Sequence, residues 1–376
     1  FPIESTTGWT RANQKGFSGL KPELTSTYEI GADLRFFNNR LGVDVTWYQA
    51  NSKDQILPVP VSNTTGYSTF ILNAGEIENK GLEAVITATP VRNSNFNWDV
   101  NINITTNKNR VVSIREGIDE ILLGSHFGYA GSTASLKLVE GQPYGAIFGT
   151  SYQRYYENPA NEDPLVVDQG RPIVIGANGF PVRSNTQRVI GKSQPDWFGS
   201  IINTITYKDF SLSFMVDTRQ GVQKYNQMDN FFAAFGIAPY TLNRNETIVF
   251  DGVLANGSPN TKPVWLGQGV GPDGENYGAG YYRNVYRGIT ENFVEDADWI
   301  RLRNLSLTYN LPQTLIRKAS MSNASLTFTG YNLWLDTPFS GFDPEGNRAN
   351  GNGDDGFGGF TYPSVRRYSF TLNVTF

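Results

Sequence analysis

The sequence contains no cysteine, one histidine and only three methionines among its 376 residues. Without cysteine there can be no disulfide framework, no thiolate zinc site and no thiol nucleophile. There is also no run of about 18 apolar residues, which excludes a transmembrane helix. The net charge of −4 comes without any basic block, so the electrostatic footprint of a nucleic-acid-binding protein is missing.

The first ten residues, FPIESTTGWT, have neither the basic n-region nor the apolar h-region of a signal peptide. If the protein is exported, its true N-terminus is therefore expected elsewhere. The mean hydropathy of −0.36 is that of a soluble protein. This average does not exclude a membrane β-barrel, because each strand has about ten residues and only every second one contacts lipid.

What the sequence does have is an excess of strand and turn formers. Aromatic residues make up 13% of the chain, with 24 Phe and 19 Tyr, and there are 39 Gly. This composition predicts an all-β protein with many turns. Alternating apolar and polar residues predict about eleven strands. They lie near residues 24–36, 41–47, 76–90, 96–105, 132–140, 143–156, 197–207, 210–216, 299–309, 324–335 and 366–376, the fifth and sixth being the weakest.

The last of these segments, RRYSFTLNVTF, alternates without a miss up to the final phenylalanine. One face is apolar and the other is polar, as in a strand between two different environments. The apolar face consists of every second residue of the C-terminus, namely Tyr368, Phe370, Leu372, Val374 and Phe376.

One predicted strand changes phase along its length. Leu305, Leu307 and Tyr309 share a face, but in the preceding residues that face would receive Arg301 and Arg303. A β-bulge near Asn304 would restore a consistent apolar face.

The connections between the predicted strands alternate between short and long. Short ones are expected at 38–40, 91–95, 140–143, 207–210 and after Leu311, and long ones at 53–75, 110–131, 157–196, 227–298 and 336–363. Outer-membrane barrels have short periplasmic turns and long extracellular loops, whereas a soluble sandwich has no reason for this asymmetry.

Aromatic residues bracket the apolar faces at the spacing of a membrane. The pairs Tyr28 and Phe36, Trp197 and Tyr207, and Tyr368 and Phe376 are 8 to 10 residues apart. With about 3.3 Å per residue and a tilt of about 40°, this spans roughly 20 to 25 Å, close to the apolar band of such barrels. Aromatic residues are common in strands of any kind, so the soluble alternative stays open on this evidence.

The parity of the strands gives a direction. If the C-terminus is periplasmic, an odd number of strands makes the first one descend from outside, and residues 1–21 belong to an extracellular loop. Eleven strands form an open sheet with two unpaired edges, and lipid cannot form hydrogen bonds with the backbone N–H and C=O groups of these edges. More protein must close the barrel.

Several blocks of sequence resemble one family. LKPELTSTYEIGADLRFFNNRLGVDVTWYQ, NAGEIENKGLEAVI, DWIRLRNLSLTYNLP and SGFDPEGN, followed by YPSVRRYSFTLNVTF, are similar in content and order to the C-terminal half of the barrel in SusC/RagA-like TonB-dependent transporters. The resemblance covers nearly the whole chain.

The resemblance implies that residues 1–376 are the C-terminal part of a 22-stranded barrel in the outer membrane of a Gram-negative bacterium. The plug, the TonB box and the N-terminal domains would be absent from this chain. The implied partners are the N-terminal half of the same transporter, a SusD-like surface lipoprotein, the TonB complex, the outer-membrane assembly machinery and the lipid bilayer.

The implied function is energised import of nutrient oligomers, either oligosaccharides or oligopeptides, with no bond broken and no cofactor. A siderophore or cobalamin receptor of the same transporter class is one alternative. A secreted all-β protein that binds or hydrolyses glycans is the alternative from another class.

No residue stands out as catalytic. Ser125 and His126 are adjacent in a predicted loop, which is not the arrangement of a nucleophile and its base. The segment GPDGENYG at 271–278 is explained by turn chemistry.

Four carboxylates gather in the Gly-rich segment before the last strand. A solvated loop is the simplest explanation, although a calcium site, with six to eight oxygen ligands, and a glycosidase acid/base pair are alternatives. The four residues are Asp343, Glu345, Asp354 and Asp355.

Candidate binding residues are aromatic and lie in the longest predicted loop. Aromatic faces suit sugar rings and peptide side chains, but the same residues could instead pack the loop on itself. They are Phe231, Phe232, Phe235, Trp265, Tyr281 and Tyr282. The predicted lumen face carries Glu29, Asp33, Arg35, Asp44, Asp99 and Asn101, as expected for a wet pore lining.

The C-terminal strand has a second expected role. A terminal aromatic residue with apolar residues at every second position resembles the signal read by the outer-membrane assembly machinery. The predicted signal consists of Phe376, Val374, Leu372, Phe370 and Tyr368.

Overall fold

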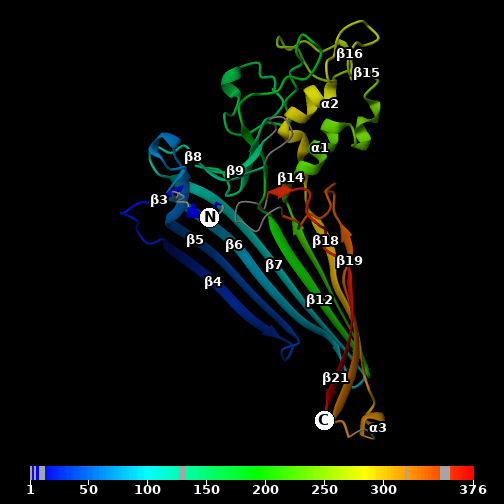
Figure 1. The fold of residues 1–376 in the computed structure, drawn as a ribbon. Coiled ribbons are helices and arrows are strands. Elements are labelled where there is room, and N and C mark those ends of the chain that lie inside the picture. The colour runs from blue at the N-terminus through cyan, green and yellow to red at the C-terminus, as the bar shows by residue number, and fades with distance from the viewer. Residues whose placement is uncertain (1, 4–5, 8–12, 127–132, 318–319, 348–355) are drawn as a thin grey trace.

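The computed structural model describes residues 2–3, 6–7, 13–126, 133–317, 320–347 and 356–376. A large, tilted and curved sheet carries a folded unit of loops at one end (Figure 1). Within the described residues, no helix is long and apolar enough to span a membrane.

Nine antiparallel strands follow one another in the large sheet, which we call the wall. They are β4 (Leu24–Phe36), β5 (Leu41–Pro60), β6 (Thr69–Arg92), β7 (Phe96–Ile114), β12 (Trp197–Tyr207), β13 (Phe210–Gln220), β18 (Trp299–Asn310), β19 (Asn323–Asp336) and β21 (Arg367–Thr375). A short strand, β3 (Gln14–Gly16), adds to the upper part of β6 in parallel.

The wall ends at β4 on one side and at β21 on the other. The number of strands is odd, so β4 and β21 run in the same direction, as predicted. The described N-terminal residues lie at the loop end and the C-terminus at the end of the short turns (Figure 1).

The prediction of about eleven wall strands is corrected to nine. The two weakest segments form β9 (Ala134–Val139) and β10 (Ala146–Gly149), which pair with β8 (Glu120–His126) and β11 (Arg188–Lys192) in a separate sheet. All but one residue of β9 and β10 are buried, so neither strand has the exposed face of a wall strand.

Two predicted connections change for the same reason. The short link at 140–143 joins β9 to β10 and is therefore a turn of the loop unit, not of the periplasmic end. The long loop predicted at 53–75 is mostly strand, because β5 and β6 continue to pair up to Pro60 and Thr69.

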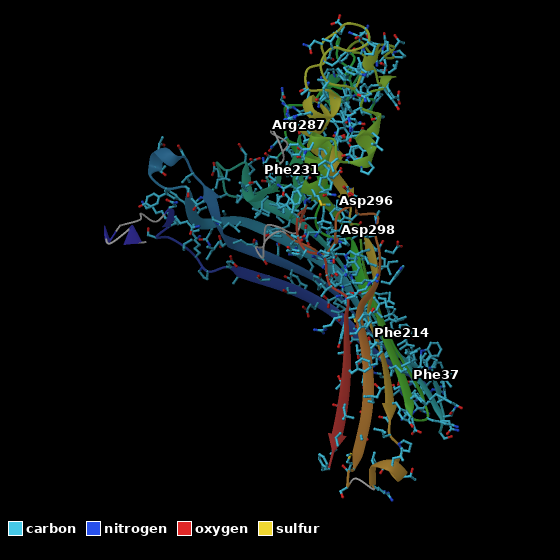
Figure 2. All side chains as sticks on the ribbon, turned by 45° about the vertical axis from the view of Figure 1, so that its right-hand side comes forward. Phe37, Phe214, Phe231, Arg287, Asp296 and Asp298 are labelled. Carbon is cyan, nitrogen blue, oxygen red and sulfur yellow. The ribbon has the colours of Figure 1, made fainter. Side chains whose placement is uncertain are left out.

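Short turns join the wall strands at the lower end. Phe37, Asn38 and Asn39 all have positive φ between β4 and β5, and two residues suffice between β12 and β13. The connection from β18 to β19 contains the short helix α3 (Gln313–Ile316). In Figure 2, Phe37 lies at this lower end, far from Phe231 and Arg287 in the loop unit.

Where β12 pairs with β13 and β18 with β19, the inner face of the wall carries small hydroxyl side chains that bond to each other. Cross-strand pairs join Thr204 to Ser213 at 3.3 Å and Ser306 to Thr329 at 2.9 Å. The opposite face exposes large apolar side chains such as Ile30, Phe210 and Phe370. This division between a polar and an apolar face confirms the predicted barrel wall.

The predicted bulge is present. The pairing of β18 with β19 skips Arg303, because Leu302 faces Trp334 and Asn304 faces Tyr331. The register of β18 against β13 shifts at the same place. The extra residue turns Arg301 and Arg303 to the polar face while keeping Leu305 and Leu307 on the apolar one.

The remaining elements build the loop unit. They are β14 (Gln223–Asn226), β15 (Thr247–Val249), β16 (Pro263–Trp265), β17 (Val294–Asp296), β20 (Phe357–Gly358), α1 (Gln227–Phe235), α2 (Tyr281–Asn284) and the 3-10 turns η3 (Pro159–Asn161), η4 (Pro239–Asn243), η5 (Tyr286–Gly288) and η6 (Thr290–Phe293). Outside this unit, β1 (Pro2–Ile3) pairs with β2 (Thr6–Thr7), and η1 (Asn63–Thr65) links β5 to β6.

Candidate functional site

The three long connections at the loop end of the wall fold into one unit. The second and third connections share a sheet, because β14 pairs with β17 and also with β20 from the last connection. One buried core takes side chains from all three connections. Its members are Ala134, Leu136, Ile147, Ile190, Tyr225, Ala233, Phe293 and Phe357. The unit is thus a packed structure at the loop end of the wall (Figure 1).

Buried polar contacts tie the first long connection to the second. The Thr150 hydroxyl donates to the Gly288 carbonyl oxygen at 2.8 Å, and Arg154 forms an ion pair with Glu291. Both side chains of the ion pair are less than 10% exposed. Burial raises the pKa of Glu291, although Arg154 pulls it the other way. Such a pair holds two loops in one register, since separating its members leaves a buried charge unpaired.

Aromatic rings fill the outer part of this unit. Tyr281 is 7% exposed and its ring lies within 6 Å of the rings of Phe180, Phe250, Tyr282 and Tyr286. Burial raises the pKa of Tyr281 far above its ordinary value, so this phenol stays neutral. For Tyr281, packing of the loop on itself is thus what the structure shows.

The other predicted aromatic residues divide between packing and exposure. Phe231 contacts the rings of Phe235 and Phe360, and Phe232 is partly buried on α1. Phe235 remains 51% exposed. Trp265 and Tyr282 are partly buried, and together with Phe235 they line one cavity.

This cavity lies between the C-terminal end of α1 and the strand β16, and its volume is about 360 Å³. Trp265 and Tyr282 provide aromatic surface, while Arg244 and Arg283 provide two cations. The lining contains no carboxylate among the residues that the structure describes. An aromatic surface beside two guanidinium groups suits a polar oligomer that carries negative charge.

Local sequence explains why α1 ends at this cavity. The Asn226 side chain accepts a hydrogen bond from the Asp229 amide and caps the N-terminus, while Gly236 ends the helix at a φ of 68°. Both are common helix-end signals. The sequence prediction contained strands and no helices, so it missed this helix. It also missed Arg244 and Arg283 as candidate binding residues. The Asn226 and Gly236 signals could have located the helix.

A second cluster lies where the last long connection touches the inner face of the wall. Arg301 Nη2 is 2.6 Å from Asp343 Oδ1, and both side chains are 3% exposed. Arg303 contacts Asp217 at 2.5 Å and Glu345 at 2.9 Å. The Trp299 ring lies over both guanidinium groups. These contacts fasten the connection between β19 and β21 to the wall.

Electrostatics favour the charged form of Asp343. Burial alone would raise its pKa, but hydrogen bonds from the Ser364 and Glu345 amides and the charge of Arg301 outweigh this and lower it. Asp343 and Glu345 are thus engaged by arginines and do not form an acid/base pair. Asp354 and Asp355 lie outside the described residues, so a calcium site involving them stays a prediction.

Other predicted features have structural explanations. GPDGENYG forms a turn in which the Gly271 amide donates to Glu275 and the Tyr277 hydroxyl donates to Asp273. Ser125 and His126 end β8, in register with Ser135 and Ala134. The structure brings no catalytic arrangement together at any predicted residue that it describes.

The predicted lumen residues lie on the inner face. Asp33 and Arg35 form an exposed ion pair at 2.9 Å, and Asp99 accepts a hydrogen bond from Thr89 at 2.7 Å. Glu29, Asp44 and Asn101 occupy the same face by the pairing of β4, β5 and β7 with their neighbours.

The residues of the predicted assembly signal lie along the edge strand β21. Tyr368, Phe370, Leu372 and Phe376 are 60 to 84% exposed on the apolar face, and Val374 is partly exposed. Their recognition by assembly machinery stays a prediction.

Comparison with known proteins agrees with this geometry. The family model described as TonB dependent receptor-like, beta-barrel, matches residues 4–243. TonB-dependent receptor P3 of Formosa agariphila is 28% identical over 95% of this chain, and TonB-dependent receptor SusC of Bacteroides thetaiotaomicron is 25% identical over 90%. The chain spans 34% and 31% of the lengths of these relatives.

Solved structures show the same fold. The structure of the RagAB peptide transporter superposes with a TM-score of 0.66 at 21% identity, covering 94% of this chain and 35% of that one. The 'open-open' state of the RagAB peptide importer gives a TM-score of 0.60. The alternative of a secreted protein that binds or hydrolyses glycans is wrong, because the matching family model and the relatives are TonB-dependent receptors, which are not enzymes. The chain belongs to the β-barrel family of the TonB-dependent receptors, which are outer-membrane proteins.

Proposed function

We propose that this chain is the C-terminal part of an outer-membrane importer of nutrient oligomers that is energised by TonB. In this proposal the plug and the remaining barrel strands belong to the N-terminal part of the same transporter. A SusD-like surface lipoprotein caps the mouth and delivers oligosaccharides or oligopeptides.

One observation carries the proposal: a folded loop unit with a cationic, aromatic cavity stands above a wall whose inner face is polar, with paired hydroxyl groups on some strands and charged side chains on others. The hydroxyl groups of these pairs bond to one another, and Asp33 and Asp99 are engaged by Arg35 and Thr89, so these groups offer few free strong bonds to cargo. We expect cargo to move along such a face without being held there, and the loops to determine which cargo is bound.

The cavity assigns a role to four side chains. Trp265 and Tyr282 would contact the face of a sugar ring or an apolar side chain, and Arg244 and Arg283 would contact an anionic group. Arg244 also donates to the Gly236 carbonyl oxygen at 3.2 Å, which fixes its position at the end of α1. Arg283 is partly buried on α2.

The similarity to a solved peptide transporter supports the oligopeptide class, and the aromatic surface of the cavity suits sugar rings as well. The solved neighbour is a peptide transporter, and SusC is a TonB-dependent receptor. Binding by the purified full-length protein, together with any lipoprotein that co-purifies, would separate them. Acidic oligosaccharides and acidic oligopeptides should be titrated against neutral oligomers of equal length.

Genetic tests examine import itself. Deleting the full-length gene should abolish growth on one oligomeric nutrient and leave growth on its monomer unchanged, and loss of TonB should have the same effect. Arg244→Gln with Arg283→Gln should weaken uptake of an anionic cargo, while Lys262→Gln, outside the cavity lining, should not. A growth defect confined to iron or cobalamin limitation would instead support a siderophore or cobalamin receptor.

A further inference from the structure

A cationic patch lies on the outward face of the wall, above the outer ring of aromatic residues. One row of cross-strand neighbours runs through Trp47, Leu82, Thr106 and Trp197. Trp47, Leu82 and Trp197 are each at least 40% exposed on the apolar face. Aromatic residues at this position mark the boundary between the apolar band and the headgroups.

The next outward row above this boundary carries two lysines side by side. Lys80 on β6 is the direct cross-strand partner of Lys108 on β7. Two residues along a strand tilted by about 40° raise a side chain by about 5 Å, so both amines stand at headgroup level. Arg110 follows one row higher, opposite Glu78.

Like charges in direct cross-strand contact destabilise a sheet unless something neutralises them. The nearby carboxylates are already engaged. Glu78 accepts a hydrogen bond from Gln49 at 2.8 Å and lies 3.4 Å from the Lys80 amine, and Glu76 accepts one from Asn51 at 2.8 Å.

Lys108 and Arg110 are exposed, and neither has an ion-pair partner among the residues that the structure describes. Glu76 pairs with Lys53 at 3.7 Å, so the three cations of the patch face the single carboxylate of Glu78, and the patch keeps a net positive charge. Its position facing the bilayer excludes the cargo pathway, which runs along the other face of the same strands.

We propose that Lys80, Lys108 and Arg110 bind the phosphate of an anionic lipid headgroup in the outer leaflet. A phosphate group offers several strong acceptor oxygens, enough to bridge the two paired lysines and reach the arginine. The acyl chains of that lipid would lie along the apolar surface beside Leu82 and Ile104, which are 43% and 40% exposed. The site depends on the chain being part of a membrane barrel and not on the nature of the cargo.

The test compares the full-length protein in neutral detergent with a variant carrying Lys80→Gln, Lys108→Gln and Arg110→Gln. Arg35→Gln, Arg171→Gln and Lys262→Gln together make a control with the same loss of charge away from the patch. Native mass spectrometry would measure binding of phosphatidylglycerol, with phosphatidylcholine and inorganic phosphate as comparison ligands.

The wild type and the control should bind phosphatidylglycerol more tightly than phosphatidylcholine, and the patch variant should lose this preference with affinity reduced at least about tenfold. Equal binding by patch and control variants would overturn the proposal. So would binding of inorganic phosphate as tight as that of the lipid, since the site would then be one for free phosphate. Heat-dependent mobility on gels confirms that each variant is folded, and uptake of cargo by the patch variant separates this site from the import function.

Discussion

Arg301 and Asp343 form a buried ion pair between the wall and the last long connection, with 2.6 Å between Nη2 and Oδ1. Forty-two residues separate them in the chain. The bulge at Arg303 makes this contact possible. If the alternation of β18 continued unbroken from Leu305 and Leu307, Arg301 would point toward lipid as they do. Arginine on the lipid face costs about 2–4 kcal/mol at mid-bilayer and less near the interface.

Replacing Asp343 with Asn should loosen the connection between β19 and β21. Removing one member of a buried pair leaves an uncompensated charge and costs about 3–5 kcal/mol. Hydrogen exchange of residues 337–347 and 356–366 in the full-length protein would measure the loss of protection. Asp33→Asn is the matched control, because its partner Arg35 is half exposed and such pairs contribute at most about 1 kcal/mol. Equal protection in both variants would contradict a fastening role for Asp343.

The sequence predicts the wall well because lipid and water on opposite faces impose a period of two. The same contrast explains why the phase change around Arg301 and Arg303 located the bulge. This reasoning does not apply to β9 and β10. Both faces of these strands are buried, so their local sequence contains no signal of which sheet they join. The contact of Arg301 with Asp343 and the cavity around Arg244 and Arg283 depend on loops meeting in space, which periodicity does not report.

Gly81 is expected to tolerate no side chain. A Cβ atom there would lie 2.0 Å from the Thr106 carbonyl oxygen and 2.8 Å from the Tyr48 hydroxyl, and Tyr48 is its direct cross-strand partner on β5. Gly81→Ala should therefore disturb the pairing of β6 with β7 at a cost of about 1–3 kcal/mol. The measurement is the fraction of folded barrel in outer membranes, read from heat-dependent gel mobility. Gly16→Ala, with no atom within 4 Å of the added carbon, should behave as the wild type. A folded fraction for Gly81→Ala equal to that of Gly16→Ala would show that the sheet relaxes around the methyl group.

Asp229 on α1 should make the loop unit less stable as pH rises. Burial raises the pKa of Asp229 from 3.8 to about 6, although the Tyr240 hydroxyl donates to it at 2.9 Å and opposes the rise. The folded unit then holds this proton more tightly than the unfolded chain. Its contribution to stability is greatest below a pH of about 4 and is lost as pH rises through about 6.

Asp229→Asn should remove this dependence. At pH 8 the variant should gain about 1 kcal/mol of local stability, allowing for the partial exposure of the carboxyl, and at pH 5 the difference should shrink. Hydrogen exchange of residues 227–243, corrected for the intrinsic effect of pH, would measure it. Asp168→Asn is the control, since that carboxylate is half exposed beside Arg171. A gain of equal size at pH 5 and pH 8 would rule out titration of Asp229 as the cause.

Deleting Phe376 should impair insertion of the full-length protein more than transport by each inserted molecule. Phe376 is 84% exposed at the end of β21, so its removal breaks few contacts with the part of the barrel that this chain forms. A loss of surface copies would then reflect recognition during assembly and not a weaker barrel. Surface labelling gives the number of inserted molecules, and uptake divided by that number gives transport per molecule. Phe328→Ala on β19 removes a lipid-facing aromatic that packs on Phe370, with ring centroids 4.9 Å apart, and should affect stability without lowering insertion as much. Normal surface levels after deletion of Phe376 would refute the assembly role.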